Sequence, residues 1–190
     1  MNISKEHSGL GGILSPLAIF LFTIVSIFLN PWFNFSEFAF SHLGGSEVSY
    51  NYIFNLGLII SGLLGTIFSF GLFNSGKKVY SKIGSISFGI GMISFSLLGV
   101  FPFGTTPHVY LAGLFYVFSI LGRIPISLSD ISHDKYLAPL IFITVIICLS
   151  LTLYLMMNQN QRFGLAIIET IGFIPIFEFQ ISYGSKLIYS

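Results

Sequence analysis

The stretch Leu97–Tyr116, LLGVFPFGTTPHVYLAGLFY, decides how this chain folds. Two prolines, with a glycine and two threonines between them, interrupt a run that is otherwise almost continuously apolar. The apolar segment that leads into it, Ile83–Phe101, is by itself long enough to cross a membrane. Because a proline ends or starts a helix at little cost, FPFGTTP predicts a tight hairpin between two helices. His108 then lies at the start of the second helix.

The composition excludes a soluble domain. Of the 190 residues, 54% are hydrophobic and 8% are charged, whereas soluble domains carry about 25% charged residues. The net charge of +1 offers no basic surface for nucleic acid. The single Cys148 lies in an apolar run, so neither a disulfide framework nor a cysteine-based metal site is available. We therefore expect a multi-pass protein of the cell membrane.

Six segments have the roughly 20 apolar residues that a transmembrane helix needs. Since backbone polar groups must be satisfied within each span, the expected fold is all-α: one domain, residues 1–190, built as a six-helix transmembrane bundle. The first segment is as long as a full span, which favours an uncleaved helix over a signal peptide. The expected spans are Leu10–Asn30, Tyr52–Phe73, Ile83–Phe101, His108–Leu128, Tyr136–Met157 and Phe163–Ser182.

Basic residues predict the orientation, because they gather in cytoplasmic loops. With both termini in the cytoplasm, only Arg162 lies outside, and seven basic residues lie inside. These seven are Lys5, Lys77, Lys78, Lys82, Arg123, Lys135 and Lys186. The outer face then holds the longest loop, Pro31–Asn51, whose aromatic residues suggest that it lies at the membrane interface. Asn34 begins a glycosylation sequon, NFS, in that loop.

Small residues predict where the helices pack. Gly57, Ser61, Gly65 and Ser69 recur every four residues in the second span, and the third span is equally rich in glycine and serine. In lipid, helices associate where small residues let their backbones approach closely. The loop between the two spans is short, so they should form a closely packed antiparallel hairpin.

Three segments carry a resemblance to a known family. They are SHLGG at Ser41–Gly45, NYIFNLGLIISGLLG at Asn51–Gly65 and IGSISFGIGMISFSLLGVFP at Ile83–Pro102, with His108 following. Together they resemble the polytopic membrane-protein family catalogued as domain of unknown function 998. The match is good over Ser41–Tyr116, and elsewhere it rests mainly on hydropathy.

The resemblance implies six helices and assigns no activity. Two departures from the family pattern stand in this chain. His42 occupies a position where the family tends to have aspartate, and Phe103-Gly104 replace an acidic pair often seen after Phe-Pro. A role that depends on those acidic residues is therefore not carried over to this chain.

The first candidate site is a polar pocket on the outer face, formed by His42, Asn55, His108 and Glu169. Glu37 and Glu47 lie on the same face, and a carboxylate inside a membrane usually faces a partner or a water-filled cavity. Two histidines and a carboxylate would suit Zn²⁺ with an open position for water, and thus hydrolysis of a lipid ester or amide. The alternative is that each histidine simply donates to a loop carbonyl.

Glu169 and Glu178 form the second candidate, a proton or cation pathway in the sixth span. Nine residues separate them, which places them on opposite faces of a straight helix, and Pro175 between them is expected to kink the helix. The alternative is that Glu169 bonds within the bundle while Glu178 reaches the inner interface.

Two further groups of residues give weaker candidate sites. A hydrolase site would need Ser41 as nucleophile and His42 as base, although adjacent side chains rarely face each other. A metal site could be formed in the inner loop by Asp130, His133 and Asp134, but such a loop is commonly solvated and caps the next helix.

These observations favour a membrane protein that binds a lipid or a small amphipathic ligand, or that serves as an accessory subunit of a membrane complex. The alternatives are a metal-assisted lipid hydrolase at His42 and His108, and a small proton-coupled carrier using Glu169 and Glu178. Membrane lipids are the expected partners, and we expect no binding to nucleic acid. The chain could also form a homo-oligomer or belong to a larger membrane complex. The sequence has no haem, flavin or nucleotide signature, and Zn²⁺ is the one cofactor considered.

Overall fold

A computed structural model describes residues 4–130, 137–157 and 164–189. These residues form six α-helices and one short 3-10 helix, η1, in the loop after the first helix. Helices are found in all six predicted regions. Their bounds are α1 Lys5–Leu29, η1 Phe40–Gly44, α2 Asn51–Ser75, α3 Val79–Val100, α4 Thr106–Asp130, α5 Leu137–Met157 and α6 Leu165–Ile188.

The helices extend beyond the predicted spans, because polar residues next to an apolar run can continue the same helix. α1 begins at Lys5 instead of Leu10, since the Ser4 hydroxyl accepts a hydrogen bond from His7 N–H (3.2 Å) and caps the first turn. α6 continues to Ile188, past the predicted end at Ser182. The predicted starts of the last two spans, Tyr136 and Phe163, lie outside the described residues.

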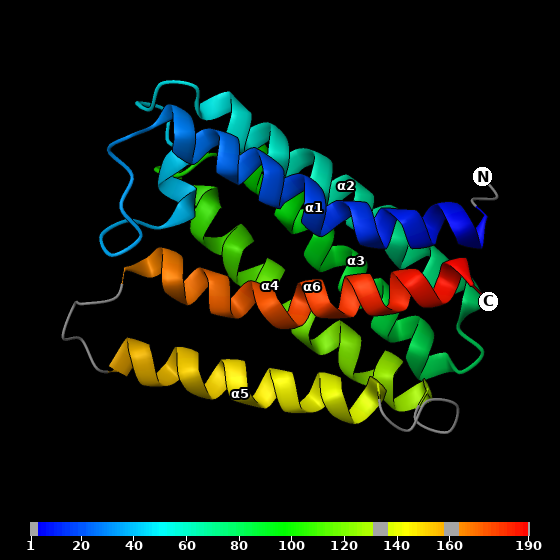
Figure 1. Ribbon diagram of the computed structural model, residues 1–190. Coiled ribbons are helices and arrows are strands. Elements are labelled where there is room, and N and C mark those ends of the chain that lie inside the picture. The colour runs from blue at the N-terminus through cyan, green and yellow to red at the C-terminus, as the bar shows by residue number, and fades with distance from the viewer. Residues whose placement is uncertain (1–3, 131–136, 158–163, 190) are drawn as a thin grey trace.

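The six helices lie side by side, and the two ends of the chain lie at the same end of the bundle (Figure 1). Neighbouring helices pack in the order α6, α1, α2, α3, α4. α4 and α6 touch only slightly, and α5 packs against both of them at the edge of the bundle. This arrangement leaves space between α4 and α6 that α5 covers.

The predicted hairpin between the third and fourth helices is confirmed. α3 ends at Val100 and α4 begins at Thr106. Within the turn, Gly104 adopts φ +95°, a conformation that favours glycine. The Thr105 hydroxyl donates to the Pro102 carbonyl (2.8 Å) and closes the turn.

Close packing of α2 on α3 is also confirmed, and it includes a glycine that is not on the predicted ridge. A Cβ atom added to Gly62 would lie 2.4 Å from the backbone nitrogen of Ser96 in α3. The predicted ridge is divided between two neighbours: Ser61 bonds to α1, whereas Gly65 meets Met92 of α3. α2 therefore uses small residues on two adjacent faces.

A polar network crosses the centre of the bundle. The buried Gln180 of α6 donates from Nε2 to Ser15 Oγ of α1 (2.9 Å). Ser15 Oγ donates to the Ser61 carbonyl of α2 (2.9 Å), and Ser61 Oγ donates to the Ser15 carbonyl (2.8 Å). Cross-helix bonding by Ser15 follows from its place in an apolar helix, but the part played by Gln180 was not predicted.

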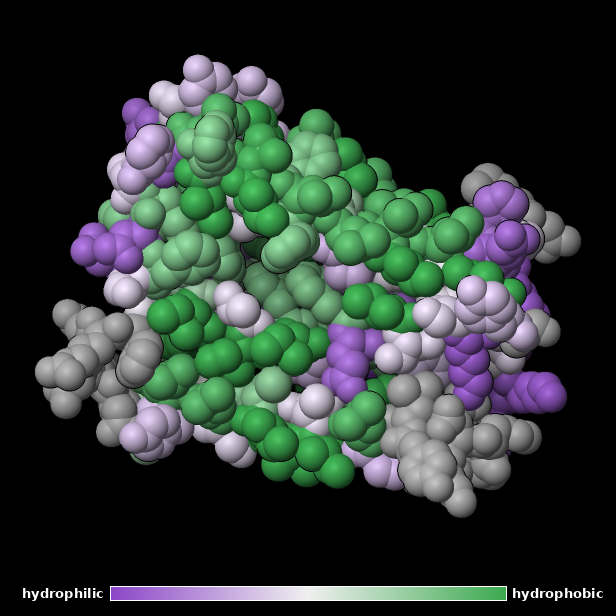
Figure 2. All heavy atoms as spheres, viewed as in Figure 1, coloured by the Kyte–Doolittle hydropathy of each residue, from purple (hydrophilic) through white to green (hydrophobic). Residues whose placement is uncertain are grey.

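The face of the bundle shown in Figure 2 is largely apolar along the helices, and its hydrophilic residues gather mainly at the two ends. Large hydrophobic side chains are exposed along the helices, including Phe28 (84%), Val109 (73%) and Ile146 (63%). Five helices have the length and hydropathy to cross a membrane, and α5 contains a shorter apolar stretch, Pro139–Leu155. An apolar surface of this extent is unfavourable in water, whereas it is favourable in contact with lipid tails. The chain is a multi-pass membrane protein.

Candidate functional site: a cavity between α4, α5 and α6

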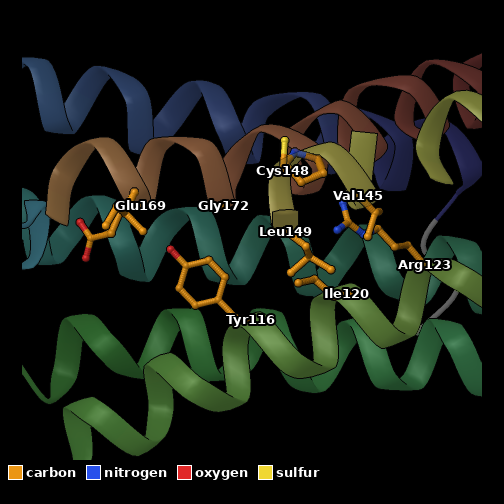
Figure 3. A pocket seen from close by; sticks show the side chains of 10 residues that line it. Tyr116, Ile120, Arg123, Val145, Cys148, Leu149, Glu169 and Gly172 are labelled. Carbon is orange, nitrogen blue, oxygen red and sulfur yellow. The ribbon is translucent and has the colours of Figure 1, made fainter. Parts of the chain in front are cut away.

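The space between α4 and α6 contains a cavity of about 340 Å³ (Figure 3). Three helices supply its walls, and most of the lining side chains are apolar. The lining residues are Tyr116, Ile120 and Arg123 of α4, Val145, Cys148 and Leu149 of α5, and Ile168, Glu169, Gly172 and Pro175 of α6. The cavity therefore lies within the apolar part of the bundle and has polar groups at only a few positions.

A small residue at the cavity wall keeps this space open. Gly172 presents no side chain, and a Cβ atom added there would lie 3.0 Å from the Tyr116 ring across the cavity. Pro175, one turn further along, is accommodated within α6, which continues as one helix from Leu165 to Ile188. Substituting a larger side chain at Gly172 would fill the space next to Tyr116.

Arg123 is the least expected residue of the cavity wall. Its side chain is fully buried, at 0% exposure. All three guanidinium nitrogens lack a hydrogen-bond partner within the part of the chain that the structure describes. The guanidinium group carries five N–H donors, so a buried donor array faces a mostly apolar cavity.

Arg123 lies inside α4, which continues to Asp130. The sequence prediction placed it near the end of the fourth span and counted it only as a charge on the cytoplasmic side, not as a site residue. The signal that could have singled it out is a lone arginine within the mostly apolar stretch SILGRIPIS. An ionisable residue within a transmembrane segment usually marks a functional site.

Glu178 of α6 is an acidic residue near enough to Arg123 for the two charges to attract each other. Its Oε2 is buried and has no hydrogen-bond partner among the described residues, and Glu178 is not one of the residues that line the cavity. Arg123 and Glu178 therefore lie in the same region without bonding to each other.

Glu169 lies at the other end of the cavity from Arg123 (Figure 3). Its Oε2 accepts a hydrogen bond from Phe40 N–H of η1 (2.7 Å). A backbone bond from Ala166 N–H to the Phe38 carbonyl (2.9 Å) lies beside it. The long loop after α1 is thus fastened to the start of α6, and the Tyr116 hydroxyl points toward this end of the cavity.

The two histidines of the predicted outer pocket pack against the same ring. The ring centroids of His42 and His108 lie 4.1 Å and 5.9 Å from that of Phe103. His108 Nδ1 bonds to the Phe101 carbonyl (2.9 Å), and His42 Nδ1 accepts from Ala39 N–H (3.0 Å). Each histidine therefore has a local backbone partner, which for His108 is the carbonyl oxygen of Phe101.

The other predicted site residues are divided between these two regions. Asn55 donates to the Gly44 carbonyl (3.0 Å) and holds η1 on α2. Of the predicted pocket, Glu169 lines the cavity, whereas His42, Asn55 and His108 do not. Within the described residues, no three His, Cys, Asp or Glu side chains come together as a metal site. The roles predicted for these residues stay predictions.

The remaining predicted positions fall at the limits of the structure. Asp130 is the last residue of α4. His133 and Asp134 of the proposed inner cluster lie outside the described residues, as does Arg162.

Comparison with known families agrees with the resemblance noted in the sequence. Residues 13–181 match the family described as "Protein of unknown function (DUF998)". The chain belongs to the DUF998 family. Neither a curated protein nor a solved structure matches it. The family description assigns no activity, so the function of this DUF998 protein has to be argued from its own residues.

Proposed function

We propose that this DUF998 protein binds a lipid or another small amphipathic ligand in the cavity between α4, α5 and α6. The observation that carries the proposal is a mostly apolar cavity of about 340 Å³ with the buried Arg123 guanidinium at one end and the half-buried Glu169 carboxylate at the other. Ligand pockets have volumes of about 300–1,000 Å³ and combine an apolar lining with a few convergent polar groups. Membrane lipids are the most abundant molecules with matching chemistry around a protein of this kind.

The proposal includes six spans with both termini in the cytoplasm. In support, both ends of the chain lie at one end of the bundle, as an even number of crossings requires. Lys5 at the start of α1 and Lys186 in the last turn of α6 belong to that end, as do Lys77 and Lys78 between α2 and α3. Cytoplasmic ends of transmembrane helices are enriched in such residues.

Filling the cavity tests the proposal. Gly172→Leu places a side chain in the space beside Tyr116, whereas Gly113→Leu, in α4, places the same side chain where nothing lies within 4 Å. Both variants and the wild type would be purified in mild detergent, and lipid retained by each would be measured by native mass spectrometry. We expect retained lipid on the wild type and on Gly113→Leu, and at least a severalfold loss on Gly172→Leu.

Equal retention by all three proteins would contradict the proposal, because the bound lipid would then lie elsewhere on the surface. A wild type that retains no lipid, but that copurifies with a second protein in fixed proportion, would favour the accessory-subunit alternative.

A further inference from the structure

We propose that the Arg123 guanidinium binds the anionic headgroup of a single-chain amphiphile, either a carboxylate or a phosphate monoester, whose chain occupies the cavity. This inference rests on the proposed function and adds the chemical class of the ligand. It places the headgroup at the Arg123 end and the chain along the wall toward Tyr116.

The Arg123 side chain is completely buried, yet none of its three nitrogens has a partner among the described residues. An unpaired cation in an apolar interior is costly, so an anion that reaches it binds with an advantage it would not have in water. The flat guanidinium fork matches carboxylate and phosphate oxygens, which it binds through two parallel hydrogen bonds.

The cavity walls near Arg123 carry no acidic side chain. The neighbours of Arg123 along the cavity are Ile120 of α4 and Val145, Cys148 and Leu149 of α5, which supply no carboxylate (Figure 3). The ligand must therefore bring its own negative charge. From Arg123 to Tyr116 the wall follows α4 for seven residues, or about 10 Å at 1.5 Å per residue, which gives room for an acyl chain.

Glu178 of α6 is an acidic residue whose charge reaches Arg123. It forms no bond with the guanidinium in the described structure and does not line the cavity. Its negative charge opposes a ligand anion that approaches the same guanidinium. Removal of that charge should therefore strengthen anion binding.

The experiment is a native mass spectrometry titration of the purified full chain in a non-ionic detergent. The probes are dodecanoate, dodecyl phosphate and dodecanol, which share a chain and differ in charge, together with acetate and inorganic phosphate, which have charge without a chain. The proteins are the wild type, Arg123→Gln, Arg123→Lys and Glu178→Gln.

For the wild type we expect both long-chain anions to bind about tenfold more tightly than dodecanol, the usual effect of a charge-assisted hydrogen bond. Arg123→Gln should bind the anions no better than dodecanol and leave dodecanol unchanged. Arg123→Lys should keep part of the preference, since it retains the charge without the fork. Glu178→Gln should bind the anions more tightly. If Arg123→Gln does not fold, Arg123→Lys and Glu178→Gln together still test the preference for anions.

Four outcomes would contradict the account, in three different ways. Equal binding of dodecanoate and dodecanol by the wild type, or an anion preference that survives in Arg123→Gln, overturns the role of Arg123 and leaves the proposed function intact. Acetate or phosphate binding as tightly as the long-chain anions overturns the amphiphile in favour of a free anion. A wild type that binds none of the long-chain probes overturns the proposed function itself.

Discussion

The Glu169 carboxylate of α6 and the Phe40 backbone amide of η1 are joined by a hydrogen bond of 2.7 Å, although 129 residues separate them in the chain. This bond fastens the loop after α1 to one end of the cavity between α4, α5 and α6. Since Glu169 also lines the cavity, the position of the loop and the shape of the cavity are connected through one side chain.

Replacing Glu169 by leucine should release η1. The Phe40 N–H would lose its acceptor, and an unpaired buried donor costs about 1–3 kcal/mol. Amide hydrogen exchange at residues 38–44 should therefore accelerate roughly tenfold or more. Glu169→Gln is the control, because its amide oxygen can still accept the bond and should preserve slow exchange. Equal protection in the leucine variant would show that the bond does not hold the loop.

The network around Gln180 makes a second prediction, for stability. Gln180→Leu removes one hydrogen bond to Ser15, and also removes an Oε1 atom that has no partner among the described residues. Hydrogen bonds between membrane helices contribute about 0.6 kcal/mol on average, so we expect only a small loss of stability in denaturant titrations. Gln180→Glu should destabilise far more, because it adds a charge to a fully buried position. The reverse order of the two variants would contradict this description.

Packing of α2 on α3 should depend on Gly62. Even the methyl group of Gly62→Ala would overlap the Ser96 backbone, with 2.4 Å between Cβ and nitrogen. Overpacking of this kind typically costs about 1–3 kcal/mol, so the melting temperature in detergent should fall. Gly113→Ala, in open surroundings, should leave it unchanged or raise it slightly. A melting temperature unaffected by Gly62→Ala would mean that the two helices pack less closely.

Much of the fold follows from the sequence. The proline-containing turn before His108 and the apolar runs correctly predict the helices, and small residues correctly predict the α2–α3 contact. The ends of the helices are harder to predict, because Ser4 caps α1 ahead of its apolar segment. The close approach of Gly62 to the Ser96 backbone is also absent from the four-residue spacing, because Gly62 is not one of the residues that recur.

The candidate site is harder to predict from the sequence than the fold is. Glu169 was predicted as a pocket residue and lines the cavity, whereas Arg123 was counted only as a cytoplasmic-side charge near the end of the fourth span. Spacing along one helix cannot show that α4 and α6 stand apart, or that α5 covers the gap between them. The cavity depends on that tertiary arrangement, and Arg123 acquires its significance only there.

Labelling from outside the cell tests the proposed orientation. In a Cys148→Ser background, Ser46→Cys in the loop before α2 and Asn74→Cys near the end of α2 each provide one exposed position. A membrane-impermeant thiol reagent added to intact cells should modify Ser46→Cys and spare Asn74→Cys until the cells are permeabilised. The opposite pattern would invert the topology, and modification of both would contradict an antiparallel crossing by α2.

The most direct test of the central claim is photo-crosslinking with dodecanoate that carries a diazirine on its chain, in phosphatidylcholine nanodiscs. The account predicts crosslinks concentrated on the walls of the cavity, near Tyr116, Leu149 and Ile168, and competition by unlabelled dodecanoate. Crosslinks spread over lipid-facing positions such as Phe20 and Phe28 of α1, without competition, would contradict it.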